Sequence, residues 1–206
     1  MNGSPIRLAL VGAAGRITEQ SLTLRRLREA VVTVTAESMT VALQSDIDFD
    51  ATVVCCLKDA RRAAESGKHV LITAPIADSV DDAAALIDFF RQCNVKFGLS
   101  GLSRNAPACQ PIIERLASGK LGDPGLLRVH RWRSQPKESI ASALFGDIDL
   151  VLHLFNSMPT EIYGIGRRSH GYHQVHLGFS EGGMALLDFA QRMPDGQAYD
   201  SLSLIG

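Results

Sequence analysis

The residues from Gly12 to Ile17 have the types and spacing of a turn that binds a dinucleotide pyrophosphate. They follow the apolar run Ile6 to Val11, which is typical of a buried strand. In the pattern G-x-G-x-x-G/A, the first glycine makes the turn, the second admits the pyrophosphate, and the third lets helix and strand pack closely. Gly12, Ala14 and Ile17 occupy these positions here, so the match is partial.

Three further residues complete this candidate cofactor site. Gly15 and Arg16 lie in the same turn, where Arg16 would help the helix N-terminus to attract an anion. Glu37 ends the next predicted strand, at about the spacing of the acidic residue that binds a ribose 2′-hydroxyl. A carboxylate there would repel a 2′-phosphate, so the sequence favours NAD over NADP without requiring that either binds. The alternative is a structural turn beside a solvated glutamate.

Other reactive side chains give weaker signals. Lys58 follows a predicted strand at the sheet edge where α/β proteins bind ligands, but a solvated lysine at a helix start is the simpler interpretation. His170, His173 and His176 are close in sequence, yet residues 173 and 176 of a strand point to opposite faces, so we predict no metal site. The cysteines have no metal-type spacing and are expected to be buried free thiols: Cys55, Cys56, Cys93 and Cys109.

Strands and helices must alternate in the first half to position the turn. The predicted strands are 6–11, 31–36, 51–57, 69–72 and 96–99, and the predicted helices are 18–28, 59–67, 83–90 and 105–118. This alternation predicts an α/β fold, a Rossmann-like doubly wound parallel sheet with strand order 2-1-3-4-5.

The pattern changes after Gly122. Strand-like runs at 126–134, 161–166, 173–179, 183–189 and 199–205 accompany one apolar helix at 147–155, and Glu181 to Gly183 signals a hairpin. We predict a smaller α+β domain with an antiparallel sheet of about five strands. The expected domains are therefore 1–121, of NAD(P)-binding type, and 122–206, a shortened α+β domain.

The run from Gly67 to Pro75 resembles the "G-K-H-V-L-x-E-K-P" signature of the glucose–fructose oxidoreductase / inositol dehydrogenase (Gfo/Idh/MocA) family. The resemblance implies NAD(P)-dependent oxidation of sugars, in which the lysine before the proline helps to transfer protons. Thr73 and Ala74 replace the glutamate and the lysine here. The resemblance also implies a cis bond between Ala74 and Pro75.

Three segments of the second half extend the resemblance. They are Leu116 to Gly122 ("L-x-x-G-x-L-G"), Gly146 to Leu150 ("H-D-I-D-L") and Ser180 to Ala185 ("F-x-x-G-x-x-A"). Active members place the Asp and His of a D-x-x-x-H motif beside the substrate, whereas Ser142 and Gly146 stand at these positions here. The resemblance therefore implies that no inherited catalytic residue remains.

Net charge and the N-terminal sequence bear on the binding partners and the cellular location of the protein. A formal net charge of -1 gives no electrostatic reason to expect nucleic-acid or membrane binding. The N-terminus lacks a basic segment typical of a signal peptide, so a cytoplasmic protein is expected.

Two functions follow from these observations. The first is an oxidoreductase homologue that has lost catalysis and acts as a binding, regulatory or scaffold protein, with at most residual NAD binding. The alternative is an active NAD-dependent oxidoreductase on a sugar or polyol with a rearranged site. We also expect a homo-oligomer formed through the C-terminal sheet, and a small-molecule ligand remains open.

Overall fold

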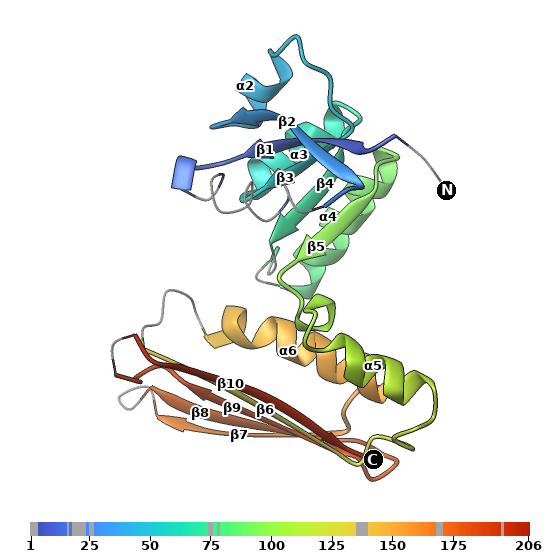
Figure 1. Ribbon diagram of the computed structural model, residues 1–206, viewed down its shortest axis with the longest axis vertical. Helices are drawn as coiled ribbons and strands as arrows, with labels where there is room; N and C mark the ends of the chain where they lie inside the picture. The colour runs from blue at the N-terminus through green and yellow to red at the C-terminus, as the bar shows by residue number, and fades with distance from the viewer. Residues whose placement is uncertain are drawn as a thin grey trace. The chain divides into compact units, whose positions relative to one another are not determined.

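The computed structural model describes residues 4–15, 17, 24, 27–73, 76, 77, 79–134, 140–167, 171–194 and 196–206, with the backbone alone for 140–143. The chain forms two compact units, Met1–Ser100 and Gly101–Gly206 (Figure 1). No described helix is long and apolar enough to cross a membrane.

The first unit is built on the predicted parallel sheet, and its order β2-β1-β3-β4-β5 is confirmed. The strands are β1 (Ile6–Val11), β2 (Ala30–Ala36), β3 (Ala51–Val54), β4 (His69–Thr73) and β5 (Phe97–Ser100). The helices are α2 (Met39–Leu43), α3 (Leu57–Glu65) and α4 (Val80–Gln92). Most of the predicted helix over 18–28 lies outside the described residues.

Local sequence explains why these helices form where they do. Ser79 caps the start of α4, ahead of the predicted residues 83–90, because its hydroxyl accepts a hydrogen bond from the Asp82 amide at 3.1 Å. Gly67 follows α3 with a φ of 71°, a left-handed conformation that glycine adopts without strain. The strand predicted over 51–57 ends earlier, at Val54, because Leu57 already belongs to α3.

The second unit contains a five-stranded sheet with the order β10-β6-β9-β8-β7. The strands are β6 (Leu126–Arg133), β7 (Glu161–Arg167), β8 (Tyr172–Gly178), β9 (Met184–Ala190) and β10 (Ala198–Ile205). The expected antiparallel sheet is a partly wrong prediction, because β6 and β9 pair in parallel. Helix α6 (Ile140–Phe155) separates β6 from its sequence neighbour β7, so β6 is free to insert between β9 and β10.

Two helices cover one face of this sheet (Figure 1). Helix α5 (Gln110–Ala117) follows a short 3-10 turn, η1 (Ser103–Asn105). The helix predicted over 105–118 therefore starts later, with Pro111 in its first turn, where the missing amide hydrogen costs nothing. Helix α6 is longer than the predicted 147–155.

The segment before β6 packs with the second unit. Ile112, Ile113 and Leu116 of α5 contact the core formed by β6, β9 and α6. The compact units consequently divide between Ser100 and Gly101, whereas the sequence predicts a boundary after residue 121.

Candidate functional site

The turn after β1 keeps the geometry that its first glycine implies. Gly12 has a φ of 153°, and its amide donates a hydrogen bond to the Ala36 carbonyl at 3.0 Å. A Cβ at this position would lie 3.3 Å from the Cys55 sulfur. Both the backbone conformation and the close neighbour therefore favour glycine here.

The next residues of the glycine-rich pattern lie on the surface of this turn. Ala14 and Gly15 are exposed, and no atom of the described residues lies within 4 Å of a Cβ built on Gly15. The Ile17 amide donates to the Ala13 carbonyl at 3.1 Å, which starts a helical turn. Arg16 lies outside the described residues.

Three strand ends meet beside this turn. Val11 pairs with Ala36 of β2 and with Val54 of β3, so Gly12, Glu37 and Cys55 follow adjacent strands. Because the sheet is parallel, all three strands end at one edge, where open α/β sheets bind ligands. Glu37 is exposed.

Asp59 is a residue of this edge that the sequence did not single out. One of its carboxylate oxygens accepts the Met39 amide at 2.8 Å, and the other accepts the Cys56 thiol at 3.1 Å. Burial, together with the Asp59 carboxylate, raises the pKa of Cys56. Asp59 thus caps the N-terminal end of α2 and favours the protonated form of the Cys56 thiol. Asp59 lies twenty positions after Met39, so this contact could not be predicted from a local sequence pattern.

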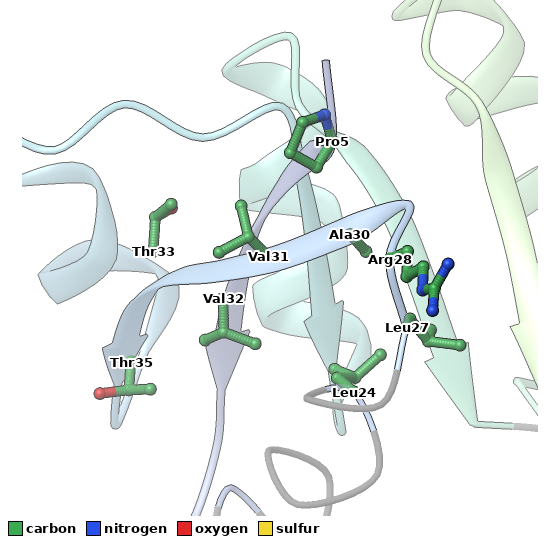
Figure 2. Close-up of a pocket in the computed structure, with 9 residues that line it drawn as sticks. All are labelled: Pro5, Leu24, Leu27, Arg28, Ala30, Val31, Val32, Thr33 and Thr35. Carbon is green, nitrogen blue, oxygen red and sulfur yellow. The ribbon is translucent and has the colours of Figure 1, made fainter. Parts of the chain in front are cut away.

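A cavity of about 660 Å³ lies along the outer edge of β2 rather than at the turn (Figure 2). Its lining combines Leu24, Leu27 and Arg28 with residues of β2, which are Ala30, Val31, Val32, Thr33 and Thr35. Neither Gly12 nor Glu37 lines it. This cavity is therefore separate from the candidate cofactor turn.

In the second unit, Gly146 occupies the position that the resemblance gives to a catalytic histidine. It is buried in α6, and a Cβ there would lie 2.7 Å from the Gly101 carbonyl oxygen and 3.1 Å from the Ser103 amide nitrogen. Backbone atoms cannot move aside for a new side chain as the end of a flexible side chain can. No side chain fits at residue 146 without moving the segment that leads into η1.

The next residue, Asp147, is the most deeply buried charge described in the second unit, at 2% exposure. Arg131 donates to both of its carboxylate oxygens at 3.0 and 2.8 Å, and the Ser103 hydroxyl donates at 2.7 Å. Burial alone would lower the pKa of Arg131, but the hydrogen bonds and charge of Asp147 outweigh it and raise that pKa. This arrangement fixes α6 to β6 and η1, which is a structural role.

Asp149 differs from Asp147 because one of its oxygens has no hydrogen bond. The Arg104 Nε lies 3.0 Å from the Asp149 Oδ2 and forms an ion pair with it. This oxygen is shielded from solvent and accepts no hydrogen bond from the described residues.

Several residues named in the sequence analysis lie outside the described part of the structure. Ala74, Pro75, His170 and the side chain of Ser142 lie outside the described residues, so the cis bond stays a prediction. Lys58 is exposed in the first turn of α3.

The strand register separates two of the three histidines that are close in sequence. His173 pairs with Gly166 and His176 with Tyr163 across the β7–β8 ladder, which puts their side chains on opposite faces. Within the described ranges, no group of three His, Cys, Asp or Glu residues could hold a metal ion.

The four cysteines are free, as expected, but their burial differs. Cys109 is buried, and desolvation raises the pKa of its thiol. Cys56 is exposed, which corrects the expectation that all four would be buried. It begins α3 at the sheet edge instead of continuing β3 into the core.

Known proteins resemble this chain in sequence and in structure. No family model matches it. The 1,5-anhydro-D-fructose reductase of Ensifer adhaerens is 28% identical over 166 residues, which cover 71% of this chain and 49% of the reductase. The chain thus spans about half the length of that relative.

Solved structures share the fold at lower identity. Scyllo-inositol dehydrogenase of Lactobacillus casei, with bound NAD(H) and scyllo-inositol, matches with a TM-score of 0.81 and 17% identity, covering 98% of this chain and 74% of that one. Myo-inositol 2-dehydrogenase of Lactobacillus plantarum matches with a TM-score of 0.80 and 14% identity, and the match covers 98% of this chain and 74% of that dehydrogenase. The sequence similarity and the shared fold confirm the resemblance of this chain to the Gfo/Idh/MocA oxidoreductases.

Proposed function

We propose that this chain is a catalytically degenerate relative of those oxidoreductases and acts as a binding, regulatory or scaffold protein. The observation that carries the proposal is Gly146, where a Cβ would meet the Gly101 carbonyl oxygen at 2.7 Å. A histidine at that point is excluded by backbone, so restoring the inherited side chain would not restore the site. Positioned acid–base catalysis contributes roughly 10²–10⁴-fold to rate, and its loss leaves binding as the remaining role.

Residual NAD binding in the first unit is the second part of the proposal. The Gly12 turn, the edge formed by three strand ends and the exposed Glu37 support it. Glu37 and Asp59 place two carboxylates at this edge, which disfavours the additional phosphate of NADP.

Thermal unfolding with NAD, NADH and NADP tests this part. A ligand at ten times its dissociation constant stabilises the protein by roughly 1.4 kcal/mol. For a chain of this size that is a shift of about 3–5 °C. We expect the shift with NAD or NADH and a smaller one with NADP.

Glu37→Gln should reduce the discrimination between NAD and NADP, while Glu65→Gln, an exposed glutamate at the end of α3, should leave it unchanged. The absence of a shift with every cofactor at millimolar concentration would remove NAD binding from the proposal. Turnover by the wild-type chain would overturn the loss of catalysis.

The alternative, an active NAD-dependent oxidoreductase on a sugar or polyol, has one observation in its favour. The Oδ2 of Asp149 is shielded from solvent and, apart from the ion pair with Arg104, has no partner among the described residues, so this carboxylate is the candidate base. NADH formation with a panel of polyols tests it directly. Turnover that disappears in Asp149→Asn but persists in Asp200→Asn would support this alternative over the first proposal.

A further inference from the structure

Strand β2 forms one edge of the parallel sheet in the first unit, and no described strand lies beyond it. In dinucleotide-binding folds with the strand order 3-2-1-4-5-6, a further strand occupies that place. The backbone groups on the outer side of an edge strand have no partners within the sheet and form a template for another strand. Strand β2 therefore offers a place where an additional strand can pair.

The residues of β2 lack the charges and prolines that commonly prevent such pairing. The strand reads Ala-Val-Val-Thr-Val-Thr-Ala, and β-branched residues favour extended pairing. Val31 is 43% exposed, and Leu27, just before the strand, is 50% exposed. The cavity of about 660 Å³ runs along this same edge (Figure 2). The outer edge of β2 is thus both accessible and largely apolar.

Hydrogen bonds to β1 show which backbone groups of β2 face outward. The carbonyl groups of Glu29 and Ala36 accept amides at the start and just after the end of β1, at 2.8 and 3.0 Å. Because successive carbonyl groups of a strand point to alternate sides, those of Ala30 and Thr35 point away from β1. These two residues lie near opposite ends of β2. A second strand of the same sequence can therefore meet both of them when it runs antiparallel.

Two unpaired charges flank β2. Arg28 and Glu37 are exposed, and neither side chain makes an ion pair or a hydrogen bond with a described residue. In the antiparallel register that pairs Ala30 with Thr35, Arg28 of one chain also faces Glu37 of the second copy. The same pair recurs at the other end, so opposite charges meet twice. A parallel copy in direct register would instead place equal charges side by side.

We propose that a second copy of this chain adds its β2 strand antiparallel to this one and joins two five-stranded sheets into one. A two-fold axis relates the copies, so each contributes the same surface. Main-chain hydrogen bonds supply the affinity, and the two pairs of Arg28 with Glu37 set the register. This contact lies in the first unit, so it differs from the expected contact through the C-terminal sheet, and it does not depend on cofactor binding.

Sedimentation velocity on the full chain, over a dilution series without nucleotide, tests the proposal. We expect a species of twice the 22.2 kDa chain mass. Arg28→Glu and Glu37→Arg each place like charges at both ends of the paired strands, so each should weaken association by about tenfold or more. A monomeric wild type, or an undiminished dimer in both variants, would overturn the proposal.

An equimolar mixture of the two variants provides the sharpest comparison. In a mixed dimer every exchanged side chain faces one of opposite charge, so Arg28→Glu and Glu37→Arg together should associate as tightly as the wild type. A variant that had failed to fold would not be rescued by mixing. Arg62→Glu, which reverses an exposed charge on α3, is the matched control and should leave the dimer intact. A mixture that stays monomeric, or equal dissociation in Arg62→Glu, would contradict the pairing of two β2 strands.

Discussion

The turn after β1 and the Gly146 segment of α6 both depart from the patterns they resemble, but they depart in different ways. At the turn, Gly12 has the backbone conformation that favours glycine, and no described atom lies within 4 Å of a Cβ on Gly15, so a larger residue at position 15 would contact none of them. At α6, backbone atoms stand where a Cβ of Gly146 would be. The first change concerns side chains, whereas the second concerns how two segments pack.

This difference indicates which role could be recovered by substitution. At Gly15 the turn would accept a side chain without contact to any described atom. At Gly146 the helix would not, because backbone atoms of the segment leading into η1 lie there and the Asp147 network holds the same two segments together. Substitution is therefore easier at this position of the turn than at residue 146.

The largest effect is expected from Asp147→Asn. Removing one partner of a buried ion pair leaves Arg131 uncompensated and costs about 3–5 kcal/mol. Urea unfolding measures it. The control Asp200→Asn breaks the half-exposed pair with Arg133, which is worth about 0–1 kcal/mol. Equal losses in both variants would mean that burial does not distinguish the two pairs.

Gly146→His should be the next most damaging. Overpacking costs about 1–3 kcal/mol, and here the obstructing atoms are backbone. Gly164→Ala provides the comparison, because a Cβ there meets nothing within 4 Å. A stable Gly146→His protein that oxidises polyols would contradict the proposed loss of catalysis at this position.

Gly12→Ala should destabilise the first unit by about 1 kcal/mol through its backbone conformation, and it should abolish any cofactor-induced thermal shift. Gly15→Ala should be near neutral in stability. Thermal unfolding with and without NAD measures both properties. Equal stabilities and equal NAD-induced shifts in the two variants would show that Gly12 is no more important than Gly15 for the turn or for cofactor binding.

The smallest effect concerns pH and the half-exposed pair of Arg7 with Asp50. The side-chain hydrogen bond from Arg7 holds the pKa of Asp50 well below its usual range. A lowered carboxyl pKa contributes stability above the unfolded value near 4, and this contribution disappears as pH falls through the folded value.

Asp50→Asn should therefore reduce the melting temperature slightly at pH 7 and progressively less below about pH 4. Salt should shrink the difference, because the pair is solvated. A difference that persists at pH 2 would assign the effect to packing rather than charge.

Periodicity in the sequence was sufficient for the parallel sheet of the first unit. Strand β1 has the predicted bounds 6–11, and the alternation of elements predicted the parallel sheet, whereas the strand order was predicted from the likeness to a Rossmann domain. Helix ends were less accessible. Residues before Pro111 form η1 rather than α5, and the apolar content of residues 105–118 did not reveal that break.

The candidate sites divide in the same manner. Glu37 and Gly12 were identified from local spacing, because strand ends and tight turns are properties of a few consecutive residues. Asp59 was missed, since its contact with the Met39 amide exists only when α2 and α3 are packed, whereas its contact with Cys56 is local to the start of α3. The parallel pairing of β6 with β9 was missed for the same reason.

The sequence by itself determined that an α/β sheet with a partial dinucleotide turn precedes a second sheet, and that Ala74, Ser142 and Gly146 stand where the family resemblance places catalytic residues. Tertiary structure alone decided that Gly146 has no room for a side chain and that Asp188 is satisfied on a sheet face that no described helix covers. The physical reason is distance along the chain. Turns and strands depend on neighbouring residues, whereas the closeness of α6 to Gly101, or of β9 to β6 and β8, exists only once remote segments share a core.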